Sequence, residues 1–396
     1  MTERLYYTNP SLLSFEATIT SKGMHKDLYY TVLDRSAFYP TSGGQLHDKG
    51  VLGGEQVVEV IESESSQVWH LSTNPAGEVG DLVTGVVDET RRKRNRQLHS
   101  AQHLLSAAFT HLLKMETVSV HLGEEYGAVE LQTSGISDEQ IETIERSVND
   151  LISQNLEISI LFATGDELAA IPLRKPSSRE GIIRIIKIGD YDWSACGGTH
   201  CSQTSEIGLV KIIGPEKMRG HILVKFLAGE QALADYAFRF KVTQELSQLL
   251  TCHPSDLLSK VQKLLSDNKT ARTEIKGLQE ALLPTLVAQL AEKKVRVSKT
   301  PFLFHHDDNL DPALLSPLAS QLAMCINGVV IITSQERLVL SVSQTTGHKA
   351  NELVKSLCQS LGLRGGGNES VAQIGGVERK MTEQIPGLIT DLLSKR

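Results

Sequence analysis

Two short segments, far apart in the sequence, each carry metal-ligand side chains at close spacing. The first holds His99 and His103, and the second, Cys196-Gly197-Gly198-Thr199-His200, holds a cysteine and a third histidine. Residues four apart project from one face of a helix, so the first two imidazoles can point at the same place. The two glycines permit a tight turn between the cysteine and the last histidine. Three nitrogens and one sulfur form the closed tetrahedral shell that zinc prefers, so we expect one Zn²⁺ per chain, held by His99, His103, Cys196 and His200.

Each segment has a simpler explanation when it is taken alone. A pair of histidines four apart on a helix is more often surface polarity or a satisfied core pair than a metal site. An intracellular cysteine is usually a small buried apolar residue. The two segments together are more specific, because each supplies half of a plausible ligand shell.

Length and composition indicate several globular domains. A chain of 396 residues is too long for one compact core, and 40% hydrophobic with 22% charged residues is typical of globular proteins. No apolar stretch is long enough for a signal peptide or a membrane span. The five cysteines are too unevenly spaced to suggest a disulfide framework. These features predict a cytoplasmic protein with no membrane partner.

The formal net charge of −7 argues against attraction of nucleic acid over the whole surface, but cations gather just before His99. The run contains five of them: Arg91, Arg92, Lys93, Arg94 and Arg96. Such runs usually form the solvated face of a helix. Because this run abuts the candidate metal site, a role in holding RNA phosphates near that site is an equal alternative.

Four regions of different character predict an α+β multidomain protein. Residues 1–87 hold short β-branched and aromatic segments broken by turn residues, which predicts a small β-barrel. Residues 88–229 alternate helices and strands, which predicts an α+β domain with the zinc site. Residues 230–298 are helical, with a coiled-coil seam from Leu257 to Leu282 that could pair within the chain or in a homodimer. Residues 299–396 form a last α/β unit that contains Gly365, Gly366 and Gly367, either a flexible turn or an anion-binding backbone.

These segments resemble those of the AlaX family, free-standing relatives of the editing domain of alanyl-tRNA synthetase, in its long form. The run from Phe38 to Gln45, with Asp48 and Gly50, resembles the family's glycine-rich barrel signature. The family's first metal motif resembles Arg92 with the run His99 to Leu105. Its second metal motif resembles the run Cys196 to His200 with Thr204, Glu206, Ile207 and Gly208. The run from Arg364 to Gly367, with Ala372-Gln373 and Gly375-Gly376, resembles the DHH-associated domain that closes the long forms. The chain departs from the usual pattern with Ser100 in place of threonine, three final glycines where relatives often have four, and Asn368 in place of arginine.

The resemblance implies a trans-editing hydrolase, an aminoacyl-tRNA deacylase acting on tRNA(Ala) that another enzyme has charged. The barrel signature lies close to Met1, so we expect no ATP-dependent activation domain. The aminoacylation pocket of a synthetase, when it is sized for alanine, cannot exclude the smaller glycine and rejects serine only imperfectly. We therefore expect hydrolysis of seryl-tRNA(Ala) chiefly, and of glycyl-tRNA(Ala). The candidate pocket residues are Ser36, Thr41, Gln45, Asp192 and Thr199, and Gly365, Gly366 and Gly367 join the basic run as candidate RNA contacts.

The chemistry leaves alternatives open. Four protein ligands leave no vacant position on the metal and normally mark a structural zinc site. In a catalytic role the zinc could bind water as a fifth ligand, exchange one protein ligand for water, or only orient the ester. The chain could also be a zinc-stabilised tRNA-binding module without catalysis. A DHH-type phosphodiesterase is a weaker alternative, since His305-His306-Asp307-Asp308 only superficially resembles the separated motifs of a two-metal site. We interpret that cluster as solvent-exposed polarity.

Overall fold

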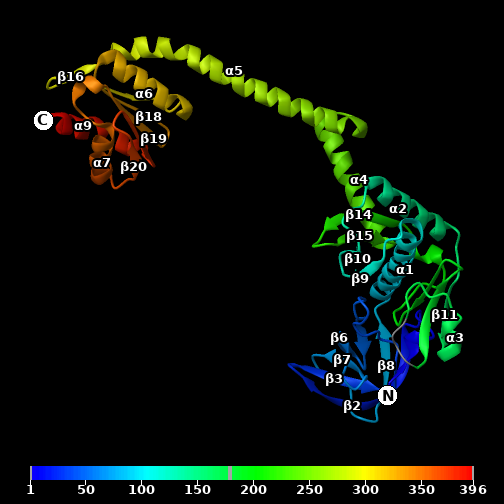
Figure 1. Ribbon diagram of the computed structural model, residues 1–396. Helices are drawn as coiled ribbons and strands as arrows, with labels where there is room; N and C mark the ends of the chain where they lie inside the picture. The colour runs from blue at the N-terminus through cyan, green and yellow to red at the C-terminus, as the bar shows by residue number, and fades with distance from the viewer. Residues whose placement is uncertain (1, 177–180, 395–396) are drawn as a thin grey trace. The chain divides into compact units, whose positions relative to one another are not determined.

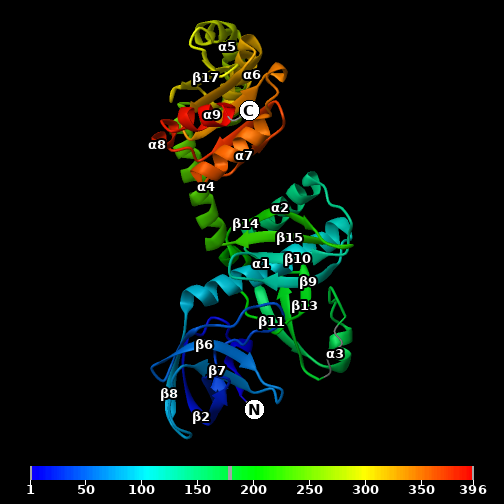
Figure 2. The same cartoon turned by 90° about the vertical axis from the view of Figure 1, so that its left-hand side faces the viewer.

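The computed structural model describes residues 2–176 and 181–394, and the chain divides into two compact units, Met1–Leu249 and Leu250–Arg396 (Figure 1). The first unit begins with a closed six-stranded barrel in the order β2-β3-β7-β6-β5-β8 (Figure 2). Its strands are β2 (Ser14–His25), β3 (Leu28–Leu33), β5 (Gly50–Leu52), β6 (Glu55–Glu62), β7 (Val68–Ser72) and β8 (Leu82–Val87). Alternate residues of β2, Phe15, Ala17 and Ile19, are buried in the barrel core, as period-two strands require. The prediction of a small N-terminal barrel is confirmed.

A short N-terminal segment runs beside the barrel and later contributes to the site. Strand β1 (Glu3–Arg4) pairs in parallel with β4 (Arg35–Ser36), and a 3₁₀ turn, η1 (Leu5–Tyr7), follows β1 directly. The ring of Tyr6 is buried against the rings of Tyr7 and Tyr39, at centroid distances of 5.1 and 5.2 Å. This packing fixes the start of the chain against the loop that follows β4.

The rest of the first unit is α+β, as expected. Helix α1 (Glu89–Leu113) begins at Asp88, whose side chain accepts the Arg91 backbone N–H, and α2 (Asp138–Ser153) has a capping box between Ser137 and Gln140. One antiparallel sheet has the order β14-β15-β10-β9 and a second the order β11-β12-β13. Their strands are β9 (Thr117–Leu122), β10 (Gly127–Leu131), β11 (Ile158–Ala163), β12 (Ile183–Ile188), β13 (Asp192–Ala195), β14 (Val210–Lys217) and β15 (Ile222–Ala228), and the remaining helices are α3 (Gly165–Ala169), η2 (Thr204–Ile207) and α4 (Glu230–Leu250).

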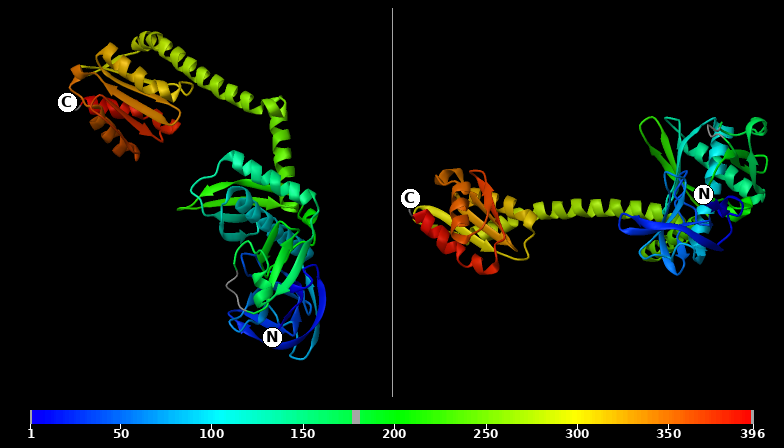
Figure 3. Two further views of the ribbon diagram at one scale, coloured as in Figure 1. Left: turned by 45° about the vertical axis from the view of Figure 1, so that its right-hand side comes forward. Right: turned by 90° about the horizontal axis from the view of Figure 1, so that it is seen from below.

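Helix α1 lies at the centre of this domain. All of its residues from Leu98 to Phe109 are buried, and the apolar ones share one core with α2 and the sheet β14-β15-β10-β9. The helix can be followed in cyan in the ribbon views of Figure 3. A helix buried this fully has little freedom to shift, so it is a rigid element on which to mount a site.

The second unit is a six-stranded sheet covered by helices on both faces. The sheet order is β16-β17-β18-β19-β21-β20, and the C-terminal end of α5 packs with α6 on one face while α7 and α9 pack on the other. The strands are β16 (Val295–Val297), β17 (Thr300–His306), β18 (Val329–Ser334), β19 (Arg337–Val342), β20 (Gly365–Gly367) and β21 (Val371–Gly375). The helices are η3 (Pro254–Asp256), α5 (Leu257–Ala291), α6 (Pro312–Ile326), η4 (Gln344–Thr346), α7 (Ala350–Leu361), α8 (Arg379–Thr382) and α9 (Ile385–Ser394).

Two sequence predictions in this unit meet different outcomes. Gly365, Gly366 and Gly367 form the edge strand β20 and not a flexible turn. A Cβ on Gly365 would lie 2.5 Å from the Gln373 carbonyl oxygen, so the close approach of β21 requires glycine there. The seam on α5 is present on one helix, but its apolar residues are exposed (Val261, Leu264, Ile275, Leu278 and Leu282), and its pairing stays a prediction. Of the described helices, none is both long enough and apolar enough to cross a membrane.

Ser36 lies inside the barrel wall. Its hydroxyl is 2.7 Å from His70 Nε2 and accepts the Phe38 backbone N–H, while His70 Nδ1 lies 2.9 Å from the Thr31 carbonyl oxygen. The carbonyl can only accept, so Nδ1 carries the proton and Nε2 accepts from the Ser36 hydroxyl. Both side chains are fully enclosed, with 0% and 1% exposure. This pair stabilises the barrel and holds the imidazole neutral.

This buried histidine predicts a pH dependence of stability. Burial lowers the pKa of His70 to about 4, whereas an unfolded histidine titrates near ~6.5. The unfolded chain therefore binds the proton more readily, so the contribution is complete above pH ~6.5 and declines as the pH falls toward about 4. Between pH 7 and pH 5 the loss is about 2 kcal/mol. In urea unfolding, His70→Gln should lose less stability over this interval than the unsubstituted protein; equal losses would contradict the assignment.

Candidate metal centre

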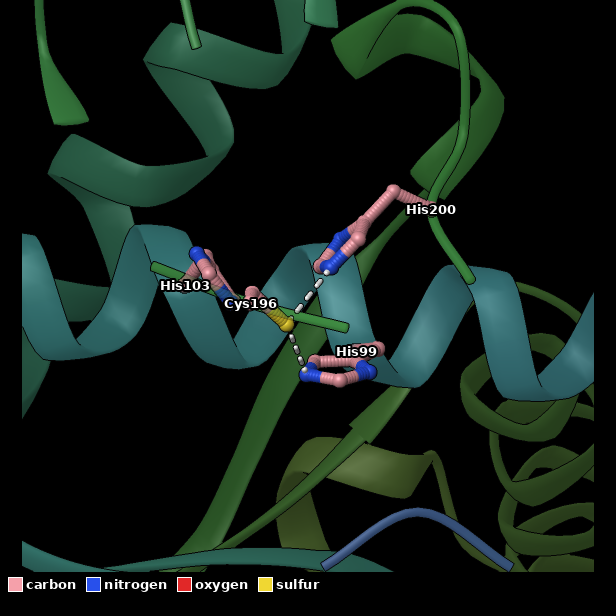
Figure 4. A group of neighbouring side chains, drawn as sticks. All are labelled: His99, His103, Cys196 and His200. Carbon is pink, nitrogen blue, oxygen red and sulfur yellow. Dashed lines mark hydrogen bonds between the residues drawn. The ribbon is translucent and has the colours of Figure 1, made fainter. Parts of the chain in front are cut away.

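The two sequence segments meet at one point. Helix α1 carries His99 and His103 one turn apart, and the loop after β13 carries Cys196 and His200 (Figure 4). One ligand atom from each residue lies within 4.8 Å of all the others. Cys196 Sγ is 3.4 Å from His99 Nε2 and 3.3 Å from His200 Nε2. Among the described residues, this is the only group of three or more His, Cys, Asp or Glu side chains that could hold a metal ion.

Each of the three imidazoles is oriented from behind through its other ring nitrogen. Nδ1 of His99 lies 2.7 Å from Gln45 Oε1, and Nδ1 of His103 lies 3.1 Å from Asp192 Oδ2. Nδ1 of His200 lies 3.2 Å from the hydroxyl of Ser100, which is on α1 between the two helical histidines. The Gln45 amide oxygen and the Asp192 carboxylate can only accept, so the neutral imidazoles of His99 and His103 carry their proton on Nδ1 and present the lone pair of Nε2 to a metal. The Ser100 hydroxyl, which can donate or accept, holds the His200 ring with its Nε2 toward Cys196 Sγ.

The turn that carries Cys196 is held by backbone contacts. The Gly198 backbone N–H donates to Cys196 Sγ at 3.3 Å. A Cβ on Gly198 would lie 2.1 Å from His99 Cε1, so no other residue fits without moving the imidazole. Arg184 on β12 donates to the carbonyl oxygens of Cys196 and Gly198, at 2.7 and 3.0 Å. These contacts fix the position of the sulfur.

The electrostatics favour the ligand form of Cys196 and His200. At His103, burial lowers the pKa, but the bonds to Asp192 and Cys196 raise it to about 9, so metal binding there displaces a proton. Burial raises the pKa of the Cys196 thiol, but the imidazoles of His99 and His200 lower it further, so the net pKa is well below its ordinary value. Burial also raises the pKa of Asp192, but its bonds from His103 and Arg174 bring it down to about 2. A thiolate and three Nε2 lone pairs, each nitrogen held by an outer partner, are a donor set that fits tetrahedral zinc.

Three predicted pocket residues lie behind the ligands. Gln45 and Thr199 are both fully buried, and Gln45 joins the barrel loop to the second metal segment: its Nε2 donates to the Thr199 hydroxyl, and its Oε1 accepts the Thr199 backbone N–H. Asp192 also bonds to Arg174 and is 2% exposed. These residues position the ligands and do not line the cavity described below.

The other two predicted pocket residues lie elsewhere. Ser36 is in the barrel wall against His70, and the Thr41 hydroxyl lies 2.9 Å from His47 Nδ1 and accepts the His47 backbone N–H. Neither is among the residues around the cavity beside the metal ligands. The turn chemistry at residues 41–45 indicated a loop near the site, but not which side chains point into it.

A cavity of about 520 Å³ opens beside the metal ligands. His99, His103 and Cys196 line one part of it, together with Gln102, Arg174, Lys175 and Ser194. The N-terminal segment and the barrel contribute Arg4, Tyr6, Tyr7, Tyr39 and Glu62 to another part of its wall. The sequence analysis missed these aromatic residues, although two adjacent tyrosines near the chain start and one in the glycine-rich signature were visible signals.

The basic run before His99 is largely engaged by the protein itself. Arg92 is 1% exposed and bonds to both carboxylate oxygens of the fully buried Asp48, so contact of this residue with RNA is not borne out. Arg91 bonds to Glu124, Lys93 to Glu230, and Arg96 to Glu206 and the His200 carbonyl oxygen. Arg94 donates to the Asn95 side chain. The run therefore connects α1 to its surroundings more than it presents free charge.

The candidate cluster at His305 to Asp308 forms no metal site in the described residues. His306 Nδ1 lies 2.9 Å from the Thr333 hydroxyl, and its Nε2 lies 3.5 Å from Asp308. The prediction of solvent-exposed polarity holds only for Asp308, since His305 and His306 lie on strand β17 and are half-buried, as is Asp307.

Comparison with known proteins connects this geometry to a family. Residues 183–222 match the model of the threonyl and alanyl tRNA synthetase second additional domain. The alanyl-tRNA editing protein AlaX-L of Pyrococcus horikoshii is 28% identical over 394 residues, which cover 97% of this chain and 96% of that protein. Because the match with AlaX-L covers almost the whole of both chains, the resemblance to the AlaX family that the sequence motifs indicated is confirmed.

The alignment with complete ligases is partial. The alanine–tRNA ligase of Archaeoglobus fulgidus is 32% identical over 391 residues, which cover 94% of this chain but only 42% of the ligase. The chain therefore spans about two fifths of that relative. The C-Ala domain of Aquifex aeolicus alanyl-tRNA synthetase is 24% identical, covering 26% of this chain and 97% of that domain, with a TM-score of 0.24. A TM-score this low supports no structural argument.

The orienting role of Gln45 predicts an effect on metal affinity. Gln45→Ala removes the acceptor behind His99 and the link to Thr199, so zinc affinity should fall by roughly 10- to 100-fold. Competition with a chromophoric chelator measures this change, and Gln203→Ala, at an exposed glutamine, is the control. Cys196→Ala should lose stoichiometric zinc altogether. Unchanged affinity in Gln45→Ala would show that the outer bond does not orient the ligand.

Proposed function

We propose that this chain is an aminoacyl-tRNA deacylase that hydrolyses wrongly charged tRNA(Ala), chiefly seryl-tRNA(Ala) and also glycyl-tRNA(Ala). Its site is the cavity beside His99, His103, Cys196 and His200, with one Zn²⁺ held by these four residues. The observation that carries the proposal is the convergence of three oriented Nε2 atoms and one thiolate at the wall of a cavity large enough for an aminoacylated nucleoside. The similarity to the alanyl-tRNA editing protein AlaX-L over almost the whole chain supports the same chemistry.

The protein's own residues bind and orient the ester in this proposal. When bound, zinc would polarise the ester carbonyl or a water molecule, or orient the ester for attack. Arg174 is fixed by Asp192 Oδ1 at 2.7 Å and by the Ser194 hydroxyl at 2.9 Å, so its guanidinium is a positioned cation at the cavity wall. Lys175 donates to the Thr117 carbonyl oxygen beside it. These cations attract the phosphate groups near the aminoacylated end of an RNA.

The cavity offers little independent acid–base chemistry. Apart from the metal ligands, the only carboxylate among its described lining residues is Glu62, which is paired with Arg4 at 2.5 Å. A water molecule that attacks the ester therefore depends for its activation on the metal centre or on the substrate's own groups. Hydrolysis should consequently fail with loss of the metal, and not only slow by a modest factor.

We propose that the second unit is a DHH-associated domain that contacts the body of the tRNA. Arg337 and Arg364 lie at the rim of a hollow beside Gly365, Gly366 and Gly367, where the backbone of edge strand β20 is accessible. Two arginines beside an accessible backbone suit phosphate oxygens. Arg91, Lys93, Arg94 and Arg96 would contribute to RNA binding only where their present partners release them, and the exposed seam of α5 would join two copies in a homodimer.

The direct test is deacylation of defined substrates by the zinc-loaded full chain. Seryl-tRNA(Ala) and glycyl-tRNA(Ala) should be hydrolysed, and alanyl-tRNA(Ala) should be spared. Cys196→Ala should reduce seryl-ester turnover by at least roughly 100-fold, since the metal that supports the reaction is lost. Cys325→Ala, at an exposed cysteine of the second unit, is the matched control and should retain full turnover.

Two results would contradict the proposed reaction, and a third would contradict the proposed metal. Binding of tRNA(Ala) without ester hydrolysis would favour a zinc-stabilised binding module. Cleavage of RNA phosphodiesters, measured on the same samples, would favour a DHH-type phosphodiesterase. Full deacylation by metal-free Cys196→Ala would exclude the zinc assignment while leaving the substrate assignment intact.

A further inference from the structure

Gln102 lies beside two of the metal ligands without holding either of them. It follows His99 by three residues on α1 and directly precedes His103, so its side chain leaves the same side of the helix as the two imidazoles. It lines the cavity together with them and keeps 5% of its exposure there. Its amide is not one of the groups that orient the imidazoles from behind. The metal centre therefore leaves this polar side chain without an assigned role.

The amide of Gln102 is held by its nitrogen, and its oxygen is free. Nε2 donates to the Ser106 hydroxyl at 2.8 Å, and the same hydroxyl accepts from the Thr117 hydroxyl at 2.9 Å. Among the described residues, no donor bonds to Gln102 Oε1, and this oxygen is not one of the unpaired atoms that the protein encloses completely. Oε1 is therefore an acceptor of fixed position that a ligand in the cavity can reach.

Acceptors of this kind are scarce in the cavity. Of the described side chains that line it, only Gln102 and Glu62 carry a carbonyl or carboxylate oxygen, which can accept but not donate. Glu62 is paired with Arg4 at 2.5 Å, in the part of the wall that the N-terminal segment and the barrel supply. Beside the metal ligands the charged groups are the cations Arg174 and Lys175. A donor group of a ligand bound there has Gln102 Oε1 as its unengaged carbonyl partner.

We propose that Gln102 Oε1 accepts a hydrogen bond from the α-amino group of the aminoacyl ester. This inference rests on the proposed function and deepens it by naming the group through which the cavity recognises an amino acid. The α-amino group donates in both its neutral and its protonated form, and it is the one donor that seryl and glycyl esters share. Gln102 therefore contributes to the affinity for each of these esters and to the rejection of acyl groups that lack an amino group.

Replacing the amide with an apolar side chain of similar size separates this role from a structural one. Gln102→Leu removes Oε1 and the bond to Ser106, whose hydroxyl keeps its bond from Thr117. A ligand with an α-amino group then loses a hydrogen bond, so its Kd should rise roughly tenfold, whereas the Kd of a ligand without this group should not change. Gln102→Glu keeps an acceptor oxygen and should keep the preference for the amino group. A side chain that only supported the fold would affect both kinds of ligand equally.

The experiment uses two matched pairs of non-hydrolysable probes with the zinc-loaded full chain. Each probe is an adenosine with a 3′-amide link, to serine or 3-hydroxypropionate in the first pair and to glycine or acetate in the second. The members of a pair thus differ only in the α-amino group. Calorimetry measures each Kd, and metal analysis should find unchanged zinc content in both Gln102 variants. Gln359→Leu, at an exposed glutamine of helix α7, is the matched control and should bind all four probes as the unsubstituted protein does.

Three outcomes would overturn the inference. The first is an unchanged Kd for the seryl and glycyl probes in Gln102→Leu, and the second is an equal loss for probes with and without the amino group. The third is a loss confined to the two probes of the first pair, which would assign the oxygen to the serine hydroxyl. Failure of the proposed function is a separate result, because the unsubstituted protein would then leave seryl-tRNA(Ala) intact. Failure of the seryl and glycyl probes to bind the unsubstituted protein would overturn the inference as well.

Discussion

The outer hydrogen bonds to the three imidazoles are the interaction on which the whole site depends. An imidazole can bind a metal through either nitrogen, and its ring can rotate about the side chain. Gln45, Ser100 and Asp192 each place an oxygen against one Nδ1, which leaves all three Nε2 atoms directed at the same point as Cys196 Sγ. Without these oxygens the same four ligand residues would not be held in one common geometry.

The fold provides these oxygens from three different elements. Ser100 lies on α1 itself, Asp192 begins β13, and Gln45 lies on the barrel loop. The barrel is therefore a part of the metal centre as well as a wall of the cavity. Arg92 strengthens this attachment, because its buried guanidinium joins α1 to the buried Asp48 and to the carbonyl oxygens of Pro10 and Ala37. Such a network holds the barrel against α1 and keeps the Gln45 side chain within reach of His99.

Local patterns predicted the elements well, because each pattern had a single physical explanation. The spacing of His99 and His103 required a helix for convergence, and the glycines before Thr199 required a turn; both are present. The direction of loop side chains was not predictable in the same way. Gln45 was expected in the pocket but faces His99, since the partner that orients it is more than fifty residues away in the sequence. Gly365 to Gly367 were expected as a flexible turn or an anion-binding backbone, but they pair with β21 as a strand, in which Gly365 and Gly367 lie too close to the β21 backbone for a side chain.

We propose that three imidazoles and one thiolate enclose a single zinc ion. X-ray absorption spectroscopy of the zinc-loaded full chain tests it most directly, because the technique reports the atoms bound to the metal and their distances. The account predicts a four-coordinate shell with one sulfur at about 2.3 Å and three nitrogens at about 2.0–2.1 Å. A shell without sulfur, or one made mainly of oxygens in six-fold coordination, would contradict it.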